Sequence, residues 1–253
     1  MSEKDKDKFR IDFIDPLFAV AIHIGFVEGL LKEGWLEHHY FPTQLQEYAS
    51  ICMFIAALTV IVASWVGYHL SINNNPIIGD ARFVLDVVLL ILYIFLLLYF
   101  RNPSSVAILM ALIFIVYTLW DYFKTREHPP KFYSDNLAPG LLVYLGRCIL
   151  GWLNRAADEK LMGEIVTFGW TVFYILLVPV AFAPLINTHT GRILFAVFLI
   201  GVALMYRSDK HTRGLLIRSI PCKLLMVGML GWTILFYTDV LGWIGIHRLS
   251  SLF

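Results

Sequence analysis

The sequence predicts an all-α membrane protein, a polytopic bundle of about seven transmembrane helices with one more helix at the cytoplasmic surface. Of the 253 residues, 58% are hydrophobic and only 15% are charged, and the mean hydropathy is +0.71. Apolar stretches follow one another from about residue 13 onward with no long polar segment between them. A water-soluble fold of this length could not bury so much apolar surface. We therefore expect a single integral membrane domain over residues 1–253.

Seven apolar runs are long enough to cross a bilayer, which takes roughly 20 helical residues. Turn-forming residues separate several of them, at Asn73 to Pro76, Arg101 to Pro103, His128 to Pro130 and Asn187 to Gly191. The seven predicted spans lie at about 14–34, 47–71, 83–101, 104–123, 164–186, 190–207 and 222–245.

The positions of lysine and arginine predict the orientation. If the N-terminal residues 1–12 are cytoplasmic, the segments on that side carry sixteen basic residues: four before the first span, Arg82, six within 124–160 and five within 207–223. The opposite side carries only Lys32, Arg101, Arg192 and Arg248. Because basic residues concentrate on the cytoplasmic side, we expect a cytoplasmic N-terminus and an outward C-terminus, in a plasma membrane or bacterial inner membrane.

An eighth apolar stretch, 137–153, is interrupted by Pro139, Gly140, Gly146, Arg147 and Gly151. If this stretch crossed the membrane, the five basic residues of 207–223 would be forced outside. We therefore expect an interfacial or re-entrant helix within a cytoplasmic segment at 124–163.

Ionisable residues within spans are costly, and each is a candidate functional residue. In the first span, Asp15, Ala19 and His23 share one helical face, which could line a hydrated path in which His23 titrates near neutral pH. Structural alternatives stay open, because Asp15 before Pro16 is typical of a helix cap and His23 could hydrogen-bond a neighbouring helix. At the end of the second span, His69 is either solvated or a partner of Asp15.

Two charge pairs have the spacing of local helix ion pairs. Glu28 precedes Lys32 by four residues, and Arg82 precedes Asp86 by four. We expect both pairs to be structural.

The chain contains no recognisable catalytic or metal-binding motif, so we expect no enzymatic activity, no metal and no cofactor. Its formal net charge of +1 argues against nucleic acid as a partner, because phosphate binding needs a concentrated basic surface.

The first 125 residues resemble a family of endolysosomal and bacterial potassium and proton-leak channels, marked by an R-x-x-x-F-S-D motif that opens the first helix. The matching stretch is Phe13 to His23, supported by Trp65 before His69 and by Asp86 early in the third span. Here the motif serine is Ile14, the arginine is Arg10, and His23 replaces a threonine. The resemblance implies that the first helix lines a pore, with Val20 at the constriction and Asp15 in an inner polar network.

Three functions follow from these observations. The leading hypothesis is a homo-oligomeric channel or leak pathway for a monovalent cation, lined by the first helix. The second is a membrane-anchored subunit whose basic cytoplasmic segment docks a soluble protein. The third is a small-solute transporter, suggested by Pro179 and Pro184 in the fifth span.

Overall fold

The computed structural model is helical throughout the residues that it describes. These are residues 3–27, 44–74, 77, 79–127, 140–153, 162–211, 216–217 and 219–250, with side chains described within 14–27, 44–71, 77, 79–127, 140–149, 163–210, 216–217 and 219–235. The elements are α1 (Glu3–Phe26), α2 (Leu45–Asn74), α3 (Asp80–Leu98), α4 (Pro103–Glu127), α5 (Leu141–Leu153), α6 (Met162–Ala181), η3 (Pro184–Asn187), α7 (His189–His211) and α8 (Ile220–Ser250).

Five of these helices are long and apolar enough to cross a membrane. They correspond to the predicted second to sixth spans and comprise Leu45–Ser71, Asp80–Leu98, Pro103–Glu127, Gly163–Ala181 and His189–Lys210. Two shorter apolar helices, Ile14–Phe26 and Ile220–Leu235, overlap the predicted first and last spans. At three of the predicted breaks a helix ends or begins as expected, since α2 ends at Asn74, α4 begins at Pro103 and α7 begins at His189. The break predicted at His128 to Pro130 lies outside the described residues.

Local capping explains several of these boundaries. The side-chain oxygen of Asn102 accepts a hydrogen bond from the amide of Ser104 at 3.0 Å, and Pro103 occupies the first helical position, where no amide hydrogen is needed. At the start of α7, the hydroxyl of Thr188 accepts from the amide of Gly191 at 3.0 Å. Both helices therefore start where the sequence supplies a side-chain acceptor for an otherwise unpaired backbone donor.

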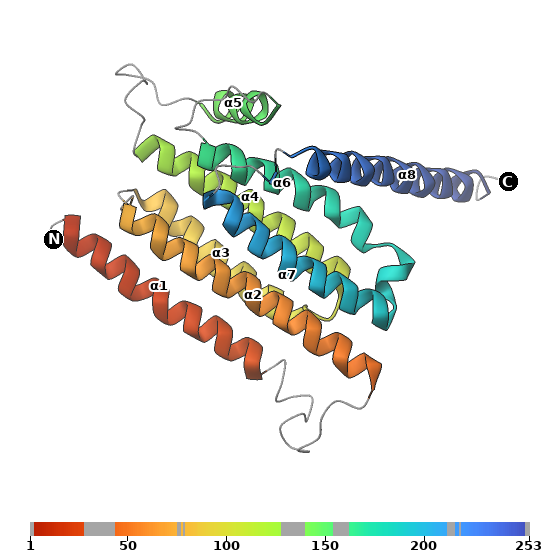
Figure 1. Cartoon of the computed structure of the whole chain (residues 1–253), viewed down its shortest axis with the longest axis horizontal. Helices are drawn as coiled ribbons and strands as arrows, with labels where there is room; N and C mark the ends of the chain where they lie inside the picture. Colours follow the sequence, from red (N-terminus) through yellow and green to blue (C-terminus); the bar gives the residue numbers. More distant parts are fainter. Residues whose placement is uncertain are drawn as a thin grey trace.

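The helices α1, α2, α3, α4, α6 and α7 form an elongated bundle (Figure 1). The closest packing is between α2 and α7, between α4 and α6, and along the series α1, α3 and α4. One end of this bundle, which we call the α5 end, holds the starts of α1, α3 and α6 and the ends of α2, α4 and α7. The interior away from the α5 end is apolar and includes the fully buried Leu96, Leu97, Met110 and Leu199.

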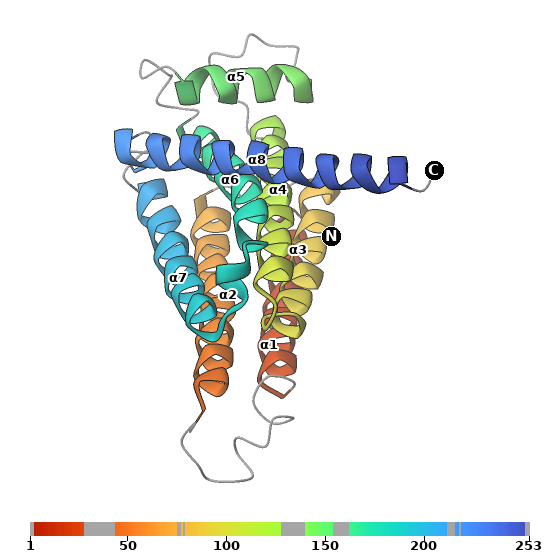
Figure 2. The same cartoon turned by 90° about the vertical axis from the view of Figure 1, so that its right-hand side faces the viewer.

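The short helix α5 runs across the bundle axis near the α5 end, rather than alongside the long helices (Figures 1 and 2). It has 13 residues, fewer than a membrane crossing requires. Its buried face, Tyr144 and Cys148, packs with Tyr122 of α4 and Phe168 of α6, while Leu142 and Val143 are exposed. This arrangement is what a helix lying in the membrane interface would adopt.

Helix α8 departs from the predicted plan. It starts near the α5 end but crosses the bundle steeply and extends away from it (Figure 2). Its main packing partner is α6, where the indole of Trp232 donates to the carbonyl of Pro179 at 3.2 Å. Most of its described side chains are exposed, so this helix is not a tightly packed seventh member of the bundle.

Candidate functional site

Buried polar side chains gather in the half of the bundle nearest the α5 end. The first group joins α3 to α4. Arg82, which is 0% exposed, donates to Glu127 at 2.8 Å, and its guanidinium lies 4.1 Å from the ring centroid of Trp120. The indole of Trp120 in turn donates to Asp86 at 2.9 Å. Arg82 and Asp86 thus lie in one cluster, although the ion pair shown for Arg82 is with Glu127 and not the predicted pair with Asp86.

A second group joins α4, α6 and α7. The carboxylate of Asp121 is 2% exposed and receives Lys124 at 3.1 Å and Lys210 at 3.1 Å, together with the hydroxyl of Thr167. Lys124 also lies 3.4 Å from Glu164. Two carboxylates and two ammonium groups therefore neutralise one another, as buried charges must if they are to remain ionised.

A chain of hydroxyl groups lies further from the α5 end. The hydroxyls of Tyr93 and Tyr117 are hydrogen-bonded to each other, and Tyr117 donates to the hydroxyl of Ser64. Beside this chain, Arg207 donates to the backbone carbonyl of Ser64 at 3.1 Å. The guanidinium of Arg207 occupies the place where a Cβ at position 67 would project, so its position depends on Gly67.

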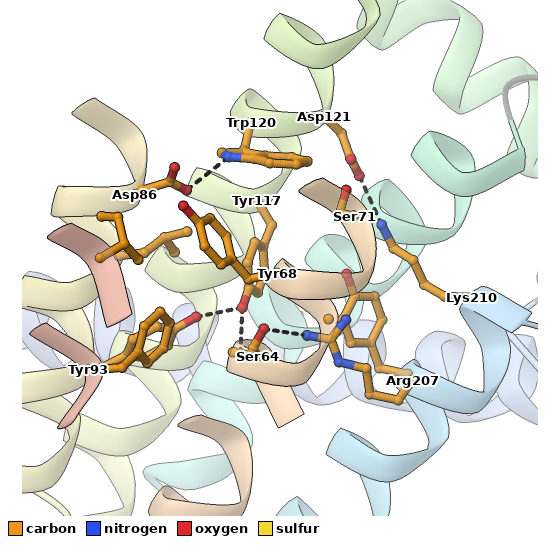
Figure 3. Close-up of a pocket in the computed structure, with 15 residues that line it drawn as sticks. Ser64, Tyr68, Ser71, Asp86, Tyr93, Tyr117, Trp120, Asp121, Arg207 and Lys210 are labelled. Atoms are coloured by element: carbon orange, nitrogen blue, oxygen red, sulfur yellow. Dashed lines mark hydrogen bonds and ion pairs between the residues drawn. The ribbon is translucent and has the colours of Figure 1, made fainter. Parts of the chain in front are cut away.

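These groups surround a cavity of about 60 Å³, which is shown in Figure 3. Since a cavity needs roughly 10–15 Å³ to hold one water molecule, this one has room for several water molecules. It is lined by Ile14, Phe18, Ser64, Gly67, Tyr68, Ser71, Asp86, Leu89, Tyr93, Tyr117, Trp120, Asp121, Tyr206, Arg207 and Lys210. The side chains come from α1, α2, α3, α4 and α7, which makes the cavity the meeting point of most of the bundle.

Two polar atoms at this cavity are buried without a hydrogen bond to any described residue. They are the second carboxylate oxygen of Asp86, Oδ2, and the hydroxyl of Tyr68. Figure 3 shows the two groups turned toward one another beside the cavity. Asp86 is only 3% exposed. A carboxylate oxygen buried this deeply is costly unless a water molecule, ion or solute in the cavity interacts with it.

Asp15, predicted as a cap or a pore residue, contacts α2. It accepts from His69 at 2.9 Å and from the indole of Trp65 at 3.2 Å. This is the Asp15–His69 partnership that the sequence left as one of two alternatives. Asp15 lies well inside α1, which begins at Glu3 and continues through Pro16, so the alternative in which Asp15 caps the start of the helix does not fit the structure.

The other first-span candidates face away from the bundle. Ala19, Val20 and His23 are exposed, and the cavity is lined instead by Ile14 and Phe18, on the opposite side of α1. A path along the predicted face would therefore lie on the outside of the described bundle. The predicted pair of Glu28 and Lys32 lies outside the described residues. Within the described part, no group of three or more metal-ligating side chains is present.

Most of the residues that line the cavity were not predicted from the sequence. Asp121 was not singled out, and Arg207 and Lys210 were assigned to a cytoplasmic loop, whereas both lie within α7. A signal was nevertheless present, because Ser64, Tyr68 and Ser71 recur at spacings of four and three residues on one face of the second span.

The docked face of α5 gives a testable prediction. Burial raises the pKa of the Cys148 thiol to about 12, so little thiolate forms near neutral pH. We expect a maleimide at about pH 8 to modify Cys148 on the order of a hundredfold more slowly in the folded protein than in detergent-denatured chain, with the rate rising with pH. Mass spectrometry of the labelled peptide measures this. Rapid labelling of Cys148 in the folded protein would show that α5 is not docked.

Comparison with protein-family models, curated proteins and solved structures gives no match for this chain.

Proposed function

We propose that this protein conducts small ions, foremost monovalent cations, across a membrane through a path that includes the central cavity. The observation that carries the proposal is that a buried carboxylate oxygen of Asp86 and the hydroxyl of Tyr68 both lie at the cavity, and neither has a hydrogen bond to a described residue. Ionisable groups at membrane depth are expensive and characteristically belong to ion pathways. A purely structural Asp86 would be expected to use both of its oxygens.

The shape of the polar region supports a path rather than an isolated binding site. Ser64, Tyr117, Tyr206 and Arg207 line the main cavity and also a second, smaller one of about 10 Å³. The second cavity reaches Tyr174 of α6, whose buried hydroxyl has no partner among the described residues. Polar groups therefore continue from Asp86 toward the middle of the bundle.

Beyond Tyr174 the described interior is apolar apart from Ser104, whose hydroxyl donates to the carbonyl of Ala181, and we take this conformation to be the closed one. Leu96, Leu97, Met110 and Leu177 are all buried there. Hydrophobic constrictions of this kind gate channels by excluding water, and a modest separation of the helices would open the path. The first helix takes part through Ile14 and Phe18, in agreement with a pathway beside that helix. A pore between copies in a homo-oligomer, lined by Ala19, Val20 and His23, is the competing route.

A small-solute transporter is the second candidate. It is favoured by Pro179, which lies inside α6 two residues before that helix ends, because interrupted helices border the binding sites of many transporters. The cavity that ends at an apolar layer is also compatible with a protein that opens to one side at a time.

Flux through liposomes that contain the purified protein tests the proposal. We expect K⁺ or Na⁺ flux above that of protein-free liposomes, with Cl⁻ flux at background, while H⁺ is measured in parallel. Equal flux of all four ions in both kinds of liposome would contradict ion conduction. That outcome would favour the partner-docking function, in which the cytoplasmic segment 124–163 binds a soluble protein.

A further inference from the structure

The cavity contains one negative and one positive side chain that are left over when the other charges are paired. Arg82 pairs with Glu127, and Lys124 and Lys210 pair with Asp121 and Glu164. The two that remain are Asp86 and Arg207, and no ion pair joins them. The cavity is therefore electrically neutral as a whole but bipolar.

The negative pole has a defined geometry. One oxygen of Asp86 is fixed by the indole of Trp120, which leaves Oδ2 beside the cavity with the hydroxyl of Tyr68 close by (Figure 3). A carboxylate oxygen and a phenol oxygen together accept the hydrogens of an ammonium group. The aromatic side chains of Tyr68 and Trp120 line the cavity beside these oxygens.

The positive pole is held on the other side of the cavity. Arg207 lies at the opposite side of the cluster from Asp86 in Figure 3. Its Nη2 donates to the carbonyl of Ser64, its Nε has no hydrogen-bond partner among the described residues, and its guanidinium carbon lies 5.4 Å from the ring centroid of Tyr206. Guanidinium donors of this kind bind carboxylates in a planar, often bidentate arrangement.

We propose that the cavity binds a small zwitterion, a solute with one ammonium group and one carboxylate, whose ammonium contacts Asp86 and Tyr68 and whose carboxylate contacts Arg207. A cation alone would leave Arg207 without an opposite charge. An anion alone would leave Asp86 without one. A zwitterion pairs with both poles and adds no net charge to the membrane interior. The small cavity of about 60 Å³ restricts the solute to the size of a short amino acid. This inference goes beyond ion conduction, since it concerns binding.

Isothermal calorimetry on the purified full-length protein tests the proposal with a series of unbranched ω-amino acids, from glycine to 5-aminopentanoate. We expect one chain length to bind best, because the two poles are a fixed distance apart. Ethylamine and acetate, which each carry one of the two charges, should bind roughly tenfold or more weakly, as expected when one partner of a buried charge pair is missing. Absence of binding by the whole series at millimolar concentration would overturn the proposal. Equal binding of acetate or ethylamine would do so as well.

Two variants with matched controls assign the poles. Asp86→Asn should weaken binding of the best zwitterion roughly tenfold or more but leave acetate binding unchanged. Gly67→Ala keeps every charge but places a methyl group where the guanidinium of Arg207 lies, so it should weaken zwitterion binding while the unfolding temperature changes little. The controls are Asp80→Asn, at an exposed position, and Gly201→Ala, where a Cβ meets no atom within 4 Å.

Wild-type affinity in both Asp86→Asn and Gly67→Ala would overturn the assignment. Because binding is measured in detergent without a membrane gradient, its outcome is independent of the flux result. If the protein binds the zwitterion but conducts no ion, this inference stands and the proposed function is wrong. If it conducts ions but binds no zwitterion, the proposed function stands and this inference is wrong.

Discussion

Replacing Asp121 with alanine is expected to lower the free energy of unfolding by about 3–5 kcal/mol, the range found when one partner is removed from a buried ion pair. Asp121 accepts from Lys124, Lys210 and Thr167 at the junction of α4, α6 and α7. Without it, the partly buried Lys124 keeps only Glu164, and the partly buried Lys210 has no other carboxylate that the structure places within ion-pair distance. Denaturant unfolding of the purified protein in detergent micelles measures the loss.

The double variant Asp121→Ala with Lys210→Met distinguishes an uncompensated charge from lost packing. Removing the unpaired ammonium should recover part of the stability, because an apolar chain of similar length costs less to bury than a lone charge. Asp80→Ala, at an exposed position, is the control for removing a carboxylate from a helix. A loss in Asp121→Ala no larger than in this control would show that the cluster is not important for stability.

Asp86→Asn is expected to reduce ion flux roughly tenfold or more, since the charged group that attracts a cation into the cavity is lost. The fold should persist, because the amide oxygen of asparagine can still accept from the indole of Trp120. Flux into liposomes at matched protein content gives the measurement, and the unfolding temperature verifies the fold.

His23→Gln is the matched control for this variant. His23 is exposed on the outward side of α1, so a path through the cavity predicts wild-type flux and an unchanged pH profile in His23→Gln. Normal flux in Asp86→Asn together with a flattened pH profile in His23→Gln would instead favour a pore between copies of the chain.

The long apolar helices were predictable because each one is an apolar run that ends at turn-forming residues. Apolar runs ended by residues such as Asn102 and Pro103 define α2, α3, α4, α6 and α7 with small errors. The interruptions in 137–153 and the surrounding charge set α5 apart from the long helices, and the structure shows a short helix there; its place at the membrane interface stays a prediction. The direction of α8 was not predictable, because apolar composition permits a helix to enter the membrane but does not determine which neighbour it packs against.

The cavity was harder to predict, because it depends on which faces of different helices meet. Asp86 was identified, but its expected partner was the nearest residue of opposite charge in the same helix. The structure gives Arg82 the carboxylate of Glu127, 45 residues away, and gives Asp86 the indole of Trp120. Arg207 was counted as a loop charge because a basic residue near the end of a span usually marks the cytoplasmic boundary. In the structure its guanidinium turns back along α7 to reach Ser64 of α2.

In the proposed route, ions pass through the cavity rather than along the outward face of α1. Single cysteines at Ser71, which lines the cavity, and at Ala19, which faces outward, distinguish the two routes when Cys52, Cys148 and Cys222 are first replaced by serine. A charged methanethiosulfonate reagent should block ion flux in Ser71→Cys and leave flux in Ala19→Cys unchanged. Block in Ala19→Cys, with none in Ser71→Cys despite complete labelling, would contradict the claim.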